Sequence, residues 1–109
     1  MQYPTRTRHC QNHHLDSTRW DHFQPRSDDI CIATSMKAGT TWTQAIVANL
    51  LHPNGEFPAP VWTLNPWIDF RGVLLDVIMD GLEAQDHRRC VKTHLPMESL
   101  RFLPELKYI

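Results

Sequence analysis

A lysine and a glycine stand two residues apart, between an apolar run and a cluster of hydroxyl side chains. Residues 34–42 read T-S-M-K-A-G-T-T-W. Backbone N–H groups at a helix N-terminus, the positive end of the helix dipole and a lysine ammonium all attract an anion. In the common nucleotide loop, G-x-x-x-x-G-K-[ST], the lysine follows the second glycine, whereas Lys37 precedes Gly39. The segment therefore predicts a phosphate-binding loop of a different kind.

A second segment whose side chains could take part in a reaction is residues 88–96, which read R-R-C-V-K-T-H-L-P. Lys92 and His94 are two residues apart, so both side chains point to the same side of an extended strand. A histidine with an ordinary pKa near ~6.5 accepts a proton at neutral pH. His94 is a candidate general base with Lys92 beside it, whereas a histidine taken alone is more often a surface or capping residue.

Two strands and a helix would position these residues. Ile30–Thr34 is almost uniformly apolar, which predicts a strand covered on both faces, as in a parallel sheet. Cys90–Thr93 is predicted to be a second short strand. A helix is predicted from Thr40 or Thr41 to about Leu51, because apolar and small residues recur there at helical spacing: Trp42, Ala45, Ile46, Asn49 and Leu50.

The rest of the chain completes an α/β pattern. Phe57–Trp67 contains three prolines and is predicted to be irregular. Val73–Glu83 is predicted to be a helix with one apolar face. Leu106–Ile109 begins another apolar strand, so we expect the front portion of a longer domain, apparently truncated at its C-terminus. The order of elements indicates a parallel sheet flanked by helices, with residues 1–24 as an N-terminal arm and residues 25–109 as the domain.

Composition limits the possible functions. The 109 residues allow at most one small domain, and a formal net charge of -1 argues against a general nucleic-acid or membrane binder. Cys31 and Cys90 lie in strand-like runs, where reduced cysteine acts as a small apolar residue, so a reducing cytoplasm is the simplest setting. The polar start of the chain predicts no signal peptide. Arg88 and Arg89 are expected to be a solvated charged pair.

The two chemical segments resemble the 5′-phosphosulfate-binding loop and the K-T-H-L-P segment of the cytosolic-type sulfotransferases, most closely the soluble bacterial members. Between them, Asn65–Asp69 looks like the tryptophan-containing acceptor-side loop of that family, and Leu100–Ile109 looks like the run into its next strand. The resemblance covers roughly residues 15–109. It implies part of a three-layer α/β domain with a P-loop-like phosphosulfate-binding loop.

The resemblance also implies roles. The donor would be 3′-phosphoadenosine 5′-phosphosulfate (PAPS), with no metal, and the acceptor a small molecule with a hydroxyl or amine. His94 would be the general base, Lys92 would lie beside the sulfuryl group, and Trp67 would contact the acceptor. Lys37 would contact the phosphosulfate. The remaining donor-binding residues would be Ala38, Gly39, Thr40 and Thr41, with Trp42 near the adenine or bracing the loop.

Alternatives stay open at this stage. In the family, residues that bind the 3′-phosphate come later than residue 109, so the chain could be an inactive fragment with half of a donor site. An ATP- or GTP-using P-loop enzyme is a second alternative, which the order of lysine and glycine disfavours. The histidines near Cys10 show no recognised zinc spacing. A homo-oligomer is neither predicted nor excluded.

Overall fold

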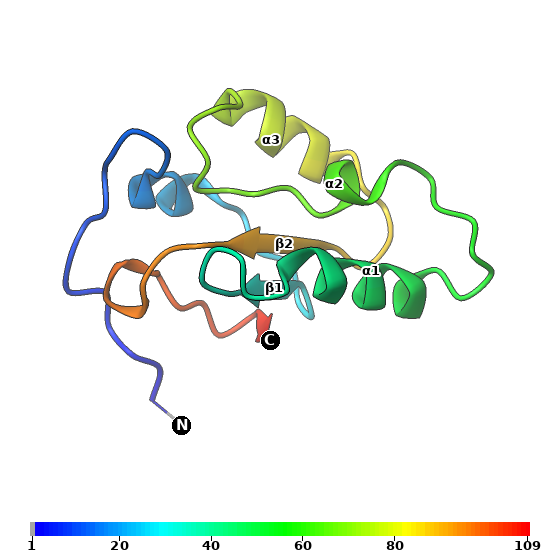
Figure 1. The fold of residues 1–109 in the computed structure, drawn as a ribbon, viewed down its shortest axis with the longest axis horizontal. Helices are drawn as coiled ribbons and strands as arrows, with labels where there is room; N and C mark the ends of the chain where they lie inside the picture. Colours follow the sequence, from blue (N-terminus) through cyan, green and yellow to red (C-terminus); the bar gives the residue numbers. More distant parts are fainter. Residues whose placement is uncertain (1) are drawn as a thin grey trace.

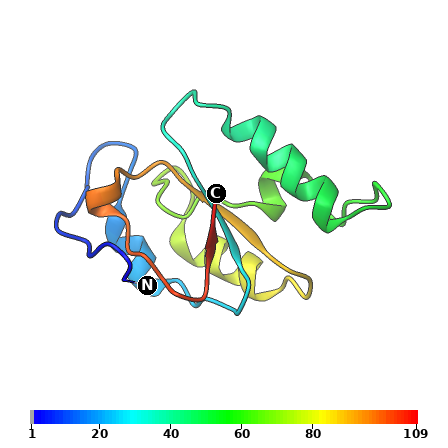
Figure 2. The same cartoon turned by 90° about the horizontal axis from the view of Figure 1, so that it is seen from below.

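The computed structural model describes residues 2–109 and contains a parallel sheet with helices on both faces (Figures 1 and 2). Its strands are β1 (Ile30–Ala33), β2 (Cys90–Thr93) and β3 (Lys107–Tyr108), in the order β2-β1-β3. Both β2 and β3 pair with β1 in parallel. This arrangement confirms the predicted α/β class.

The central strand is buried on both faces, as its uniform apolar sequence predicted. Side chains alternate along a strand, so Cys31 joins one apolar cluster while Ile30 and Ile32 join another. Burial raises the pKa of the Cys31 thiol, and it raises that of Cys90 to about 12. Both cysteines are therefore apolar core residues rather than nucleophiles.

Helices cover the two faces of the sheet. Helix α1 (Thr40–Leu51) places Val47 against Ile30 and Ile32, and helix α3 (Leu75–Glu83) places Ile78 and Leu82 in the cluster on the other face. The two helices lie on opposite sides of the strands in Figure 2. The remaining short helices are η1 (Ser17–His22), α2 (Val61–Leu64) and η2 (Met97–Ser99).

Helix α1 has the predicted bounds, but it does not bury the residues whose spacing predicted it. Trp42 is 79% exposed, and Ile46 and Leu50 are also exposed. The buried face instead carries Val47 and Gln44, whose side-chain amide donates to the carbonyl oxygen of Asn65 at 3.2 Å. A polar residue lies inward here because the neighbouring backbone offers it a partner, which residue spacing cannot indicate.

Smaller differences occur in the central part of the chain. The proline-rich segment, predicted to be irregular, contains the single helical turn of α2, which starts directly after Pro60. Helix α3 begins at Leu75 rather than at Val73, and Leu74 and Val77 of its predicted apolar face are exposed. Only part of the predicted apolar face of α3 therefore packs in the core.

Residues 15–23 contribute directly to the main core. Asp16 caps η1 by accepting a hydrogen bond from the amide of Thr18, and the helix carries Trp20, which is fully buried. Leu15 and Phe23 belong to the same apolar cluster. The N-terminal arm therefore contains a short helix that packs against the sheet domain.

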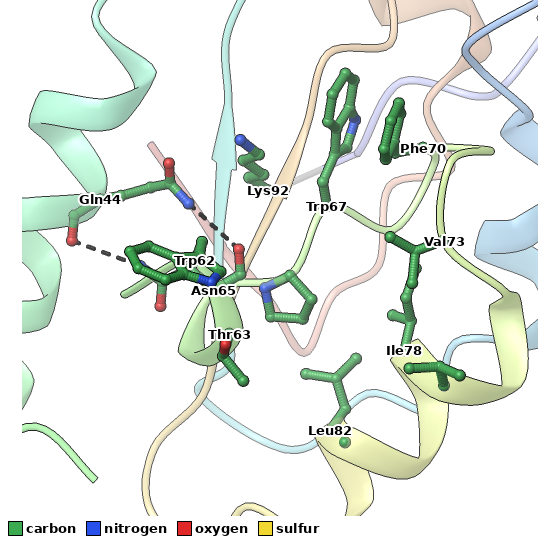
Figure 3. Close-up of a pocket in the computed structure, with 13 residues that line it drawn as sticks. Gln44, Trp62, Thr63, Asn65, Trp67, Phe70, Val73, Ile78, Leu82 and Lys92 are labelled. Carbon is green, nitrogen blue, oxygen red and sulfur yellow. Dashed lines mark hydrogen bonds between the residues drawn. The ribbon is translucent and has the colours of Figure 1, made fainter. Parts of the chain in front are cut away.

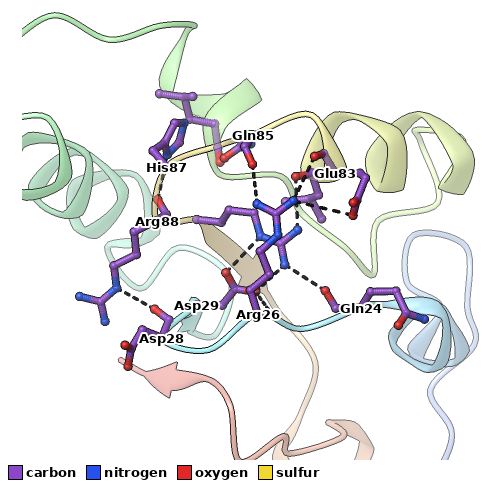
Figure 4. A network of polar contacts seen from close by, with 11 residues as sticks. Gln24, Arg26, Asp28, Asp29, Glu83, Gln85, His87 and Arg88 are labelled. Carbon is purple, nitrogen blue, oxygen red and sulfur yellow. Dashed lines mark hydrogen bonds and ion pairs between the residues drawn. The ribbon is translucent and has the colours of Figure 1, made fainter.

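Arg89 was expected to be solvated, and this prediction is wrong. Arg89 and Asp29 are each only 2% exposed, and they form a two-point ion pair with distances of 3.1 Å (Nε to Oδ1) and 2.5 Å (Nη2 to Oδ2). Arg89 also donates to the carbonyl oxygens of Gln24 and Leu82. Figure 4 shows this network between the start of the sheet and the end of α3. Only Arg88 is exposed as expected.

Replacing Arg89 by alanine should destabilise the fold strongly. The variant leaves the Asp29 carboxylate buried without its cation, which typically costs about 3–5 kcal/mol. The free energy of unfolding from urea titration is the measurement. Arg88→Ala is the matched control. It should change the free energy of unfolding by at most about 0.5–1 kcal/mol, since Arg88 is exposed. Equal effects of the two substitutions would contradict this account of the pair.

Candidate active site

The loop between β1 and α1 has an unusual backbone at its two predicted key residues. Lys37 has a φ of 60° and Gly39 a φ of 87°, both in the left-handed region. Glycine adopts this conformation freely, whereas a lysine there is strained, and such strain often accompanies function. The loop residues 35–39 are all exposed. The turn therefore leaves the lysine at the protein surface directly before the helix.

The amino end of α1 is open to an anion. Gly39 is the N-cap residue, and within residues 2–109 no side chain caps this end of the helix. Thr40 is buried and its hydroxyl is hydrogen-bonded to that of Thr34, while Thr41 is exposed. Unpaired N–H groups in the first turn of a helix, next to a lysine, are the kind of environment that attracts a phosphate.

His94 comes to the same edge of the sheet because β1 and β2 run in parallel. Its Nδ1 atom lies 2.8 Å from the carbonyl oxygen of Thr34, the residue that follows β1. A carbonyl oxygen can only accept, so Nδ1 carries the proton and Nε2 of the neutral ring keeps a free lone pair. The contact thereby selects the tautomer that a general base at Nε2 requires.

Lys92 and Trp67 lie next to this histidine. The ring of Trp67 meets that of His94 edge-on, with 4.7 Å between their centroids, and the Lys92 ammonium lies 5.1 Å from the centre of the indole. Burial lowers the pKa of Lys92 from its ordinary value, and the negative charge of Asp69 opposes that shift. A cation is thus held over an aromatic ring beside the candidate base.

Trp67 and Lys92 also line a pocket of about 360 Å³ (Figure 3). Trp67 stacks on Phe70 at 4.5 Å between ring centres, and side chains of α3 form much of the opposite wall. The exposed apolar residues Val73 and Val77 line this pocket, as does Trp62. The size and the mainly apolar lining suit a small organic molecule.

The structure places the sequence-predicted residues in two neighbouring groups. Trp67 contacts both Lys92 and His94, and the bond of His94 to Thr34 joins them to the start of the loop that carries Lys37. Trp42 lies on the exposed face of α1. Within residues 2–109, no group of three or more potential metal ligands occurs, and no helix is long and apolar enough to span a membrane.

Sequence reasoning missed three residues around the site. Phe70 stacks on Trp67, Gln44 lines the pocket, and Asp69 is fully buried and accepts a hydrogen bond from Trp67. The only available signal was an acidic residue two positions after Trp67 in an otherwise apolar segment. Such a residue in a core needs partners, which the sequence does not identify.

Comparison with known proteins gives a consistent family. The model of the sulfotransferase domain matches residues 27–109. The chain is 38% identical over 94 residues to a glycolipid sulfotransferase of Mycobacterium tuberculosis, 38% over 82 residues to cytosolic sulfotransferase 13 of Arabidopsis thaliana, and 32% over 82 residues to sulfotransferase 1A1 of Canis lupus familiaris.

These matches take in 86%, 72% and 72% of this chain but only 29%, 25% and 28% of the respective relatives. The chain therefore spans less than a third of the length of the relatives it matches. The part that it does contain carries the loop, the two parallel strands and the histidine described above. The chain belongs to the sulfotransferase family.

Proposed function

We propose that the chain supplies the 5′-phosphosulfate-binding loop and the general base of a PAPS-dependent sulfotransferase site. The observation that carries this proposal is the hydrogen bond between His94 Nδ1 and the carbonyl oxygen of Thr34. It joins the two sequence motifs at one edge of the sheet and leaves Nε2 able to accept a proton.

The loop residues suit the donor. PAPS supplies an activated sulfuryl group when it is bound. The open amino end of α1, with the amides of Ala38, Gly39, Thr40 and Thr41, would hold the 5′-phosphate, and Lys37 would offset charge on the phosphate that leaves. The exposed ring of Trp42 is available to the adenine.

His94 and Lys92 then serve the acceptor. Nε2 of His94 would accept the proton of an acceptor hydroxyl, whose oxygen would bond to the sulfur as the bond between that sulfur and the phosphate oxygen of the donor breaks. The Lys92 ammonium offsets negative charge on the sulfuryl oxygens. Charge in such a transfer spreads over several oxygens, so positioning and electrostatic stabilisation account for most of the catalysis.

The acceptor would enter the pocket beside Trp67. Its aromatic and aliphatic lining favours an apolar alcohol or phenol as the acceptor. One relative is a glycolipid sulfotransferase, and a lipid-linked hydroxyl is also an apolar alcohol.

Two relatives carry "cytosolic" in their names, in keeping with a cytoplasmic site of action. We assign residues 25–109 to the front part of the sulfotransferase domain. The 3′-phosphate of the donor would be bound by other residues of a complete domain.

Lys37→Ala should abolish stabilisation by the donor product 3′-phosphoadenosine 5′-phosphate. At about 100 times its dissociation constant, a ligand specific for the folded state adds about 2.7 kcal/mol, which a thermal-unfolding titration detects. Lys107→Ala removes another exposed lysine and should keep the full shift. A shift that survives in Lys37→Ala would refute the role of Lys37, and a larger shift with ATP and Mg²⁺ would favour a nucleotide-using enzyme.

His94→Asn should remove the base while keeping the bond to Thr34, because the asparagine amide can donate in place of Nδ1. Sulfate transfer to 2-naphthol should fall by about 10²–10⁴-fold, with donor binding unchanged. The assay uses a chimera in which residues 1–109 replace the matching part of the mycobacterial glycolipid sulfotransferase. His87→Asn is the control, since Nδ1 of His87 also lies 2.9 Å from a carbonyl oxygen. Retained turnover in His94→Asn would exclude His94 as the base.

A further inference from the structure

Asp69 is a fully buried carboxylate with three hydrogen-bond donors around it. Its Oδ1 accepts from the indole Nε1 of Trp20 at 3.1 Å. Its Oδ2 accepts from the indole Nε1 of Trp67 at 2.6 Å and from the backbone amide of His94 at 3.3 Å. The donors come from three separate parts of the chain: η1, the segment that follows α2, and the residue after β2. One side chain thus connects the core with the candidate active site.

The partners of Asp69 differ from those of the other buried acidic residue. Asp29 is neutralised by Arg89 in a two-point ion pair. The donors recorded for Asp69 are instead two indoles and an amide, all of them neutral. Burial of a carboxylate is costly unless its oxygens are hydrogen-bonded, so these donors are held firmly. Such an arrangement provides the hydrogen bonds that the buried carboxylate needs, and it also fixes the three donor groups in place.

The bond to Trp67 fixes the orientation of the ring. An indole packed between other side chains can still rotate, but a hydrogen bond at Nε1 defines which edge faces inward. The same ring stacks on Phe70, lies against the Lys92 ammonium and meets His94 edge-on. The second bond to Oδ2 holds the backbone of His94 itself. Both bonds to Oδ2 therefore end on residues of the proposed site.

We infer that Asp69 is a positioning residue that presets Trp67 and His94 for binding of the acceptor. This inference rests on the proposed function. The charge of Asp69 also acts on Lys92, where it opposes the effect of burial on the pKa of the ammonium. Asp69 does not line the pocket and would not touch the acceptor. It acts through the residues it holds.

A purely structural role would have a different signature, because the two oxygens serve different partners. Trp20 bonds to Oδ1 and lies in the core, outside the pocket lining. Trp20→Phe therefore removes one hydrogen bond of Asp69 and loosens the core while leaving both bonds to Oδ2. Asp69→Ala removes all three. The comparison separates loss of stability from loss of positioning.

The test measures binding of two probes to the purified chain: 2-naphthol for the acceptor pocket and 3′-phosphoadenosine 5′-phosphate for the loop. Asp69→Ala should lower the affinity for 2-naphthol by about tenfold or more and leave that for the nucleotide within about twofold. Trp20→Phe should leave both affinities within about twofold. Unchanged 2-naphthol binding in Asp69→Ala, or an equal loss in the two variants, would overturn the positioning role.

A measurement on the unaltered chain keeps the inference testable if Asp69→Ala does not fold. The indole N–H of Trp67 should exchange with solvent far more slowly in NMR spectra than those of Trp42 and Trp62, which are exposed. Exchange as fast as that of Trp42 would overturn the inference. Absence of nucleotide binding to the unaltered chain would instead contradict the proposed donor site, while slow Trp67 exchange and 2-naphthol binding would still support the role of Asp69.

Discussion

Parallel pairing of β1 with β2 is the constraint on which the rest of the site depends. The register aligns Ile30 with Cys90 and Ala33 with Thr93, so the two strands start and end together. At one end the flanking residues Asp29 and Arg89 face each other and form the buried ion pair. At the other end the chain continues into Thr34 and His94, whose hydrogen bond joins the loop to the candidate base. A slip by one residue would separate both pairs at once.

Two buried carboxylates therefore have distinct structural tasks. Asp29 closes the end of the sheet remote from the site, together with Arg89 and carbonyl groups near α3. Asp69 lies toward the site and links it to the core through Trp20. Each connects segments that are far apart in the sequence, and each gives a short chain with a small core a polar contact of high directional specificity.

The sequence was sufficient for the elements whose pattern is local. The uniform apolar run of β1, the start of α1 after Gly39 and the strand at Cys90–Thr93 were predicted close to their actual bounds. Strand geometry also placed Lys92 and His94 on the same side, and both contact Trp67, although their catalytic roles stay predictions. What the sequence could not supply was the pairing of distant residues. Predicting the burial of Arg89 requires the strand register, and predicting the proposed role of Asp69 requires the knowledge that Trp20 bonds to it.

The apolar spacing in α1 was informative about the helix but not about its orientation. Trp42, Ile46 and Leu50 mark a helical stripe that faces outward, while Gln44 faces the pocket. Residue spacing identifies a stripe, and only the tertiary partners determine which side of the helix contacts the sheet. The same reasoning explains Val77 of α3, which belongs to an apolar face and lines the pocket rather than the core.

The left-handed backbone at Lys37 has an evolutionary consequence. Glycine would adopt a φ of 60° without strain, and asparagine or aspartate would tolerate it better than lysine does. Substitutions that relieve the backbone strain of the loop are therefore those that remove its positive charge. Selection for stability alone would drive this position away from lysine, and the proposed contact of the ammonium group with the donor would oppose that drift.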